Sequence, residues 1–242
     1  MNATEFKLEF SAVAKETQGI PVVIVAAGSS SRMKGIDKQF ATILGIPLLA
    51  RTMSAFEKSP YISSIVIVTQ KDKIADIKLL AQKYMITKLY AVTEGGDCRE
   101  KSVEKGLKAL PENTTKALVH DGARPLVSQD VIKNVVLSLK DNDCVACGVK
   151  VKDTIKKVNS EGFFTETVER ENLISIQTPQ GVNVSKFLDV AKQTNLDKFT
   201  DDTSVLEFLG VKTKFVDGDY KNIKVTTPED IALATVYLEG EL

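Results

Sequence analysis

The sequence has no excess of charge of either sign. Lysine plus arginine and aspartate plus glutamate each number 32 among 242 residues. No global field therefore draws the protein to nucleic acid or to an acidic membrane surface. Any anion site must be made locally, by cations that the fold places together. The hydrophobic fraction of 43% is that of a globular protein, and the length suffices for one large core.

Cysteine is scarce, and its three copies, Cys98, Cys144 and Cys147, form an odd number. An odd number in a chain of this length argues against a disulfide framework. Cys144 and Cys147 have metal-ligand spacing, but no second pair completes a zinc site and their neighbours are apolar. We therefore interpret them as small core residues of a protein from a reducing compartment.

A continuous apolar run is missing from the first 19 residues, which contain five charged side chains between Glu5 and Glu16. We therefore expect neither a signal peptide nor a membrane span, and we expect a cytoplasmic protein. Internal repeats and low-complexity segments are missing too. We assign residues 1–19 to an extension of unknown role and residues 20–242 to a single domain.

Short apolar runs do recur along the chain, with helical-period segments between them. The predicted strands are residues 22–27, 65–69, 88–92, 117–120, 144–149 and 211–216, and the predicted helices are residues 47–58, 72–84, 100–110 and 129–139. This alternation is typical of parallel βαβ units. We predict an α/β fold with a Rossmann-like, mostly parallel sheet and helices on both faces. Ligands of such sheets bind at the carboxyl ends of the strands.

Residues 150–176 break this pattern. Two polar, strand-like segments flank a turn at residues 159–162, which predicts a β-hairpin arm that protrudes from the sheet. An isolated hairpin is seldom stable without a partner that covers it. We therefore infer a homodimer, in which a second copy of the chain covers the arm.

The loop that follows the first predicted strand combines small residues with cations. Gly28 and three serines precede Arg32, Lys34 and Lys38. Small residues let backbone N–H groups turn toward an anion, and nearby cations neutralise it, so we predict a polyphosphate ligand. The spacing fits neither the Gly-x-Gly-x-x-Gly fingerprint of dinucleotide sites nor the Walker A loop.

Two further loops follow predicted strands. The segment at residues 95–103 begins with two glycines, which suit a close backbone approach, and Asp97 could cap the helix that follows. The segment at residues 120–125 offers the Asp121 carboxylate as a ligand for Mg²⁺. His120, the only histidine, is expected to pack at the strand end rather than to act as a base.

Two acidic pairs have simpler interpretations than metal binding. Asp201 and Asp202 open a segment of helical period, so helix capping is the expected role. Asp217 and Asp219 flank a glycine, which is typical of a turn.

Taken together, these segments resemble the family of 2-C-methyl-D-erythritol 4-phosphate cytidylyltransferases, enzymes of the non-mevalonate isoprenoid pathway. The resemblance runs from about residue 20 to residue 238. It is carried by residues 26–40, 95–103, 120–125, 153–154, 167–170, 177–180, 199–202 and 222–226. One departure is Asp37, which stands where the family usually has a proline and puts a negative charge beside the predicted triphosphate loop.

The resemblance implies transfer of CMP from CTP to 2-C-methyl-D-erythritol 4-phosphate, with release of pyrophosphate, in a homodimer that uses Mg²⁺. It implies catalytic roles for Arg32 and Lys38 on the triphosphate and a metal-binding role for Asp121. The CTP-binding residues that it implies are Ala26, Ala27, Gly28, Ser29, Gly96, Asp97, Ser102, Arg124 and Thr178. The residues that it implies for the acceptor phosphate are Lys224 and, from the neighbouring subunit's arm, Thr154 and Arg170.

Two alternatives remain open at this point. A ribitol-5-phosphate cytidylyltransferase would carry the same nucleotide loops and take a different acceptor. A non-catalytic nucleotide-binding protein is also compatible with the fold, because fold does not fix function.

Overall fold

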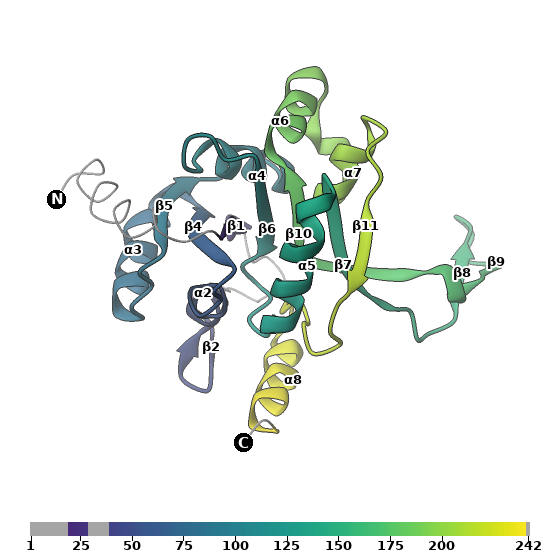
Figure 1. Cartoon of the computed structure of the whole chain (residues 1–242). Helices are drawn as coiled ribbons and strands as arrows, with labels where there is room; N and C mark the ends of the chain where they lie inside the picture. Colours follow the sequence, from purple (N-terminus) through teal and green to yellow (C-terminus); the bar gives the residue numbers. More distant parts are fainter. Residues whose placement is uncertain (1–18, 29–38, 241–242) are drawn as a thin grey trace.

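A seven-stranded sheet forms the centre of the protein (Figure 1). The computed structural model describes residues 19–28 and 39–240. The strand order is β11-β7-β10-β6-β1-β4-β5. The strands are β1 (Ile20–Val25), β4 (Ile62–Thr69), β5 (Leu89–Glu94), β6 (Lys116–Asp121), β7 (Cys144–Lys150), β10 (Ile174–Asn183) and β11 (Lys214–Asp217). Only β10 pairs antiparallel with its neighbours in this sheet, so the mostly parallel sheet is confirmed.

Helices cover both faces of this sheet. One layer contains α2 (Leu48–Glu57), α3 (Ile74–Lys83) and α5 (Gln129–Asp141), and the other contains α4 (Arg99–Lys108), α6 (Val184–Gln193) and α7 (Asp202–Glu207). Alternate residues of β1 face the two layers: Val22 and Ile24 pack with the first, Val23 with the second. All three are fully buried, as expected of a strand covered on both sides.

Local sequence explains why the helices form where they do. In α5, Val131, Val135 and Leu139 recur at helical spacing and are buried against the sheet. Ser128 caps this helix by accepting a hydrogen bond from Val131 N at 3.3 Å. The remaining elements are short or peripheral: β2 (Thr42–Ile43), β3 (Ile46–Pro47), α8 (Pro228–Glu239), and the 3₁₀ helices η2 (Lys71–Lys73), η3 (Arg170–Asn172) and η4 (Leu196–Lys198).

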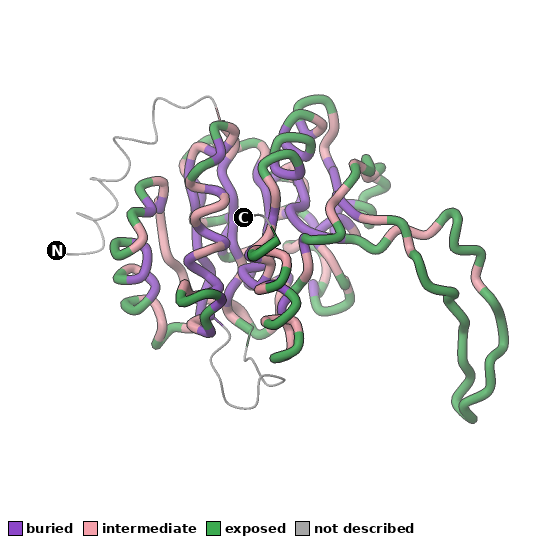
Figure 2. Tube along the Cα trace, turned by 90° about the horizontal axis from the view of Figure 1, so that it is seen from below, coloured by how far each residue is buried: buried purple, intermediate pink, exposed green. Residues whose placement is uncertain are grey.

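The predicted arm is present as a hairpin of β8 (Ile155–Val158) and β9 (Phe164–Val168), which projects away from the sheet (Figure 1). It leaves the sheet after Lys150 and returns at Ile174, and these two residues pair with each other. Nearly all of the arm is exposed (Figure 2). Its tip carries Phe163 and Phe164, which are 68% and 72% exposed.

Strand β10 corrects the sequence analysis, which predicts no strand between residues 170 and 183. The segment contains Pro179 and Gly181 and lacks a run of β-branched residues, so its local signal is weak. Its position between β6 and β7 is set by pairing on both sides. Strand β11 begins three residues later than predicted, at Lys214.

The predictions about helix caps and cysteines can be compared with the structure. Asp97 does not cap α4; the Cys98 side chain does, by accepting from Lys101 N at 3.4 Å. Asp201 caps α7 as predicted. The cysteines are free, and burial raises the pKa of Cys144 and of Cys147 to about 12, in agreement with a core role. Among the described residues, no helix is both long and apolar enough to cross a membrane.

Candidate functional site

Three loops meet at the carboxyl edge of the sheet, after β1, β5 and β6. Gly122 N donates to Val25 O at 2.9 Å, which holds the β6 loop against the end of β1. Gly95, after β5, lies so close to Ala27 that a Cβ atom on Gly95 would stand 2.5 Å from the Ala27 Cβ. A side chain at residue 95 would therefore separate the two loops. Glycine allows this contact between the segments predicted to bind the nucleotide.

The β5 loop is held in shape by Ser102, from the first turn of α4. Ser102 Oγ accepts from Gly96 N at 3.0 Å and donates to Cys98 O at 2.9 Å. The neighbouring Asp97 carboxylate is 94% exposed and lies 3.7 Å from Lys101 Nζ. Ser102 thus fixes the backbone of Gly96, while Asp97 extends into solvent.

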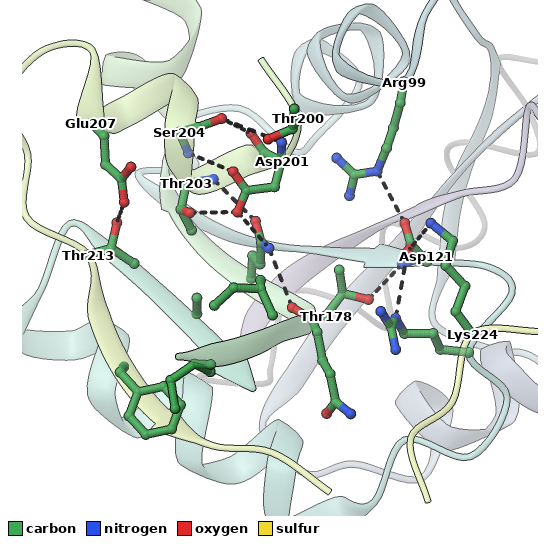
Figure 3. Close-up of a pocket in the computed structure, with 17 residues that line it drawn as sticks. Arg99, Asp121, Thr178, Thr200, Asp201, Thr203, Ser204, Glu207, Thr213 and Lys224 are labelled. Carbon is green, nitrogen blue, oxygen red and sulfur yellow. Dashed lines mark hydrogen bonds and ion pairs between the residues drawn. The ribbon is translucent and has the colours of Figure 1, made fainter. Parts of the chain in front are cut away.

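The Asp121 carboxylate, at the end of β6, is surrounded by three cations (Figure 3). Oδ1 lies 3.2 Å from Arg99 Nε, and Oδ2 lies 2.8 Å from Lys224 Nζ and 3.6 Å from Arg124 Nε. Burial raises the pKa of Asp121, but Arg99 and Lys224 outweigh burial and hold that pKa well below its usual range. Lys224 is the most exposed of the three cations, at 40%, so it is the one best placed to meet an anionic ligand.

Thr178 joins this cluster from β10. Its hydroxyl oxygen accepts from Asp121 N at 3.0 Å and lies 3.1 Å from His120 Nδ1. His120 is fully buried against Phe56, and burial lowers its pKa to about 3. The predicted packing role of His120 is confirmed, because a histidine held neutral in the core has no access to a substrate proton.

The C-terminal segment is tied to the same loop. Arg124 Nη1 donates to Asn222 O at 2.7 Å, and Val225 N donates to Ala123 O at 2.8 Å. These bonds lie on either side of Lys224 in the sequence and hold it beside Asp121. Residues from three regions of the chain, 120–125, 177–178 and 222–226, therefore converge on one place.

A pocket of about 670 Å³ opens beside this cluster (Figure 3). One end contains the charged residues Arg99, Asp121, Arg124 and Lys224, and Glu207 and Thr213 lie at the opposite end (Figure 3). The lining also includes the apolar side chains of Ile176 and Phe215. The start of α7 and the two residues before it line the pocket with polar groups, from Thr200, Asp201, Thr203 and Ser204. A small ligand with an anionic end and a partly apolar body fits this lining.

The predicted site residues also include some outside the described part of the chain and some on the arm. Ser29, Arg32 and Lys38 fall outside the described residues. Thr154 and Arg170 belong to the arm and do not line the pocket. Arg170 Nη1 donates to Lys152 O at 2.7 Å, within the base of the arm. In one subunit the arm residues and the Lys224 cluster are therefore not brought together.

Two residues of the cluster escaped the sequence analysis as site candidates. Arg99 belongs to the motif at residues 95–103, in which the sequence predicts roles only for Gly96, Asp97 and Ser102. Asp202 was interpreted as part of a helix cap, whereas its carboxylate is fully buried and faces the Arg99 guanidinium. A cation directly after the glycine loop was the available signal for Arg99. No local signal pairs it with Asp202.

Known proteins share this sequence and fold. The family described as 2-C-methyl-D-erythritol 4-phosphate cytidylyltransferase (IspD) matches residues 20–240. Two proteins of that name, from Clostridium botulinum (strain Okra / Type B1) and Clostridium novyi (strain NT), are 42% and 40% identical to this chain over 221 and 222 residues. Each match covers 90% of this chain and 96% of the relative.

Solved structures agree. The 4-diphosphocytidyl-2C-methyl-D-erythritol synthase of Anaerococcus prevotii DSM 20548 superposes with a TM-score of 0.81 at 31% identity, covering 93% of this chain and 98% of that one. The 2-C-methyl-D-erythritol 4-phosphate cytidylyltransferase of Thermus thermophilus gives a TM-score of 0.72 at 26% identity, covering 92% and 100%. Sequence and fold therefore lead to one conclusion: this chain belongs to the 2-C-methyl-D-erythritol 4-phosphate cytidylyltransferase family.

Proposed function

We propose that this chain transfers CMP from CTP to 2-C-methyl-D-erythritol 4-phosphate. An oxygen of the acceptor phosphate attacks the α-phosphorus of CTP, the bond from that phosphorus to the bridging oxygen of the β-phosphate breaks, and pyrophosphate leaves. The observation that carries the proposal is the position of Lys224 beside Asp121, at the charged end of a pocket that adjoins the nucleotide loops. Family membership supports the same reaction.

The protein contributes little covalent chemistry to such a transfer, so positioning and charge must supply the acceleration. We assign the cytosine end of CTP to Ala26, Ala27, Gly96, Asp97 and Ser102. The close contact between Gly95 and Ala27 supports this assignment, because it makes one surface from two loops.

The triphosphate is assigned to the first loop, with Gly28, Ser29, Arg32 and Lys38. Arg32 and Lys38 would neutralise the crowded charge at the α-phosphorus, and the fork of Arg32 suits two phosphate oxygens at once. Arg124 and Thr178 support the site from the loop after β6 and from β10. Their contacts with Asn222 O and with Asp121 N favour a positioning role.

The acceptor phosphate is assigned to Lys224 of one subunit and to Thr154 and Arg170 of a second copy. Neither of the last two lines the pocket of its own subunit, and the tip of the arm exposes Phe163 and Phe164, which a partner would cover. A homodimer joined through the arm would bring both halves of the acceptor site together. A cytoplasmic location, where the expected substrates are soluble metabolites, stays a prediction.

We assign the Mg²⁺ site to Asp121. A carboxylate has lone pairs beyond the two that Arg99 and Lys224 occupy at 3.2 and 2.8 Å, and Mg²⁺ is commonly held by one carboxylate together with substrate phosphates. The described residues contain no cluster of three or more acidic, histidine or cysteine side chains suited to a metal. The proposed ion would therefore be shared between Asp121 and the phosphates of the substrate. When bound, the ion would offset the charge of the triphosphate.

The decisive experiment measures pyrophosphate release with CTP, Mg²⁺ and one acceptor at a time. We expect release with 2-C-methyl-D-erythritol 4-phosphate and little with ribitol 5-phosphate. A preference for ribitol 5-phosphate would change the acceptor and keep the reaction class. CTP binding without release for either acceptor would favour a non-catalytic nucleotide-binding protein and overturn the proposal.

A further inference from the structure

Arg99 connects two carboxylates that belong to different elements. Its Nη1 and Nη2 each lie 2.8 Å from one oxygen of Asp202, and its Nε lies 3.2 Å from Asp121 Oδ1. Arg99 is the first residue of α4, Asp202 the first of α7, and Asp121 the last of β6. The guanidinium therefore joins three element ends at the charged end of the pocket.

The Asp202 end of this connection is rigid. Its side chain has no exposed surface. The backbone N–H groups of Asp202 and Thr203 donate to Gln180 Oε1 at 3.0 and 3.2 Å, and the Gln180 amide donates to Asp201 Oδ2 at 3.1 Å. The backbone at the start of α7 is thus tied to β10, and the buried Asp202 carboxylate that it carries fixes the plane of the Arg99 fork.

Stability alone does not account for a pair of this kind. A buried ion pair gains little over apolar side chains of the same volume, because both charges must leave water. What an apolar pair cannot supply is a donor aimed at a second carboxylate. Arg99 Nε is such a donor, since the bidentate contact with Asp202 leaves it facing Asp121.

The orientation of Asp121 depends on contacts at both of its oxygens. Arg99 holds Oδ1, and this leaves Oδ2 directed at Lys224 Nζ, 2.8 Å away, and at Arg124 Nε, 3.6 Å away. The backbone N–H of Asp121 is held separately by Thr178. If Arg99 Nε were lost, the carboxylate could rotate, and Lys224 would lose the partner that keeps it at the edge of the pocket.

We propose that Arg99, held by Asp202, is a positioning residue that orients the Asp121 carboxylate and, through it, Lys224 for the acceptor phosphate. This inference rests on the proposed function. Arg99 itself is not assigned to the reacting atoms. Its loss should therefore act on use of the acceptor and leave CTP affinity largely unchanged.

The test uses two variants that separate positioning from stability. Arg99→Lys keeps a positive charge beside Asp202 but removes the guanidinium Nε that reaches Asp121. The double variant Arg99→Met with Asp202→Leu removes both charges of the pair and refills their volume. Val205→Ala is the matched control, because it creates a cavity in α7, where Val205 is fully buried, without altering the Arg99 contacts.

The measurements are the melting temperature, kcat, and the KM for each substrate in the pyrophosphate assay. Positioning predicts that both Arg99 variants lower kcat/KM for the acceptor by about tenfold to a hundredfold, the usual effect of losing a group that orients a ligand side chain. The KM for CTP should stay within about twofold. Val205→Ala should melt at a lower temperature and keep the kinetics of the unmodified protein.

Two results would overturn the inference. One is a double variant with near-normal acceptor kinetics and a melting temperature equal to that of the unmodified protein. This result would mean that the pair of Arg99 and Asp202 serves only the fold. Equal losses for CTP and for the acceptor would place Arg99 in the nucleotide site instead. The unmodified protein is assayed alongside: if it releases no pyrophosphate with either acceptor, the proposed function itself fails, and this inference fails with it.

Discussion

Lys224 Nζ lies 2.8 Å from Asp121 Oδ2, and the chain holds this contact from both sides. The hydrogen bond from Arg124 to Asn222 O lies before Lys224, and the bond from Val225 N to Ala123 O lies after it. The backbone that carries the flexible Lys224 side chain is therefore held beside the end of β6, and the ion pair with Asp121 places its ammonium group. The contact between these two residues gives the first prediction.

Replacing Lys224 by methionine should weaken use of the acceptor. The variant keeps most of the apolar stem and removes the charge that the proposal assigns to the acceptor phosphate. We expect the KM for the acceptor to rise by roughly tenfold or more, since a hydrogen bond to a charged group contributes about 1.5–3 kcal/mol. Steady-state kinetics with each substrate varied in turn would measure it.

The control for this prediction is Lys212→Met, at an exposed position in the segment before β11. It removes one positive charge from the surface and should leave both KM values unchanged. A similar rise in the KM for the acceptor in both variants would indicate a general effect of surface charge. An unchanged KM in Lys224→Met would remove Lys224 from the acceptor site.

The second prediction concerns Arg32 and Lys38, which the proposal assigns to the α-phosphorus. Replacing either by alanine should lower kcat by about a hundredfold or more, the scale seen when one charge-stabilising donor is removed. Single-turnover measurements would separate this chemical step from product release. Near-normal turnover in both variants would contradict the assignment of the catalytic cations.

The outline of this site could be predicted from the sequence because its parts follow strand ends. Apolar runs place Ala26, Gly95 and Asp121 at the carboxyl ends of parallel strands, and these ends lie at one edge of the sheet. The order of strands and helices is therefore enough to predict that these distant motifs lie together.

Contacts made by residues that do not follow a parallel strand could not be predicted from the order of strands and helices. Strand β10 has little strand propensity of its own, and its place between β6 and β7 is decided by its neighbours. Asp202 follows the capping residue Asp201, and an acidic residue is common in the first turn of a helix. Its burial depends on Arg99, which lies in another helix and is remote in sequence.

The third prediction tests whether two subunits share each acceptor site. Subunits with Arg170→Ala and subunits with Lys38→Ala should be nearly inactive alone and regain activity when mixed after mild dissociation. About half of randomly paired dimers would be mixed, and each would hold one intact site, so roughly a quarter of full activity is expected.

The matched control for this experiment pairs Arg170→Ala with Thr154→Ala. Both changes fall on the arm, so every site of a mixed dimer would receive one damaged arm and no activity should return. If activity also returned in this control, the recovery in the first mixture would not be evidence for shared sites. The absence of rescue in the first mixture would argue against an arm that serves the neighbouring subunit.

The fourth prediction concerns the pH dependence of stability and follows from the buried His120. Thr178 Oγ1 accepts from Asp121 N, so its proton is available for His120 Nδ1, and His120 Nε2 then donates to Arg124 O at 3.2 Å. The neutral ring is fully bonded in this arrangement. Burial lowers the pKa of His120 to about 3 in the folded protein, whereas an unfolded histidine has a pKa of about 6.5.

Between these two pKa values the unfolded chain binds a proton at His120 and the folded protein does not. The contribution of His120 to stability is therefore complete above about pH 6.5 and declines as the pH falls toward 3. The expected slope approaches 1.4 kcal/mol per pH unit between about pH 6 and pH 4. Since this is the only histidine in the chain, no other imidazole contributes to that slope.

Carboxylates also titrate in this range, so the contribution of His120 must be measured as the difference between the unmodified protein and a His120→Asn variant. Burial raises the pKa of Glu100 and of Asp202, which gives these residues the opposite slope, and both are present in the unmodified protein and in a His120→Asn variant. Urea unfolding at several pH values, without divalent cations, should give a steeper loss of stability on acidification for the unmodified protein. Parallel curves for the two proteins between pH 6 and pH 5 would mean that His120 accepts a proton in the folded state, and that the core around Phe56 admits the charge.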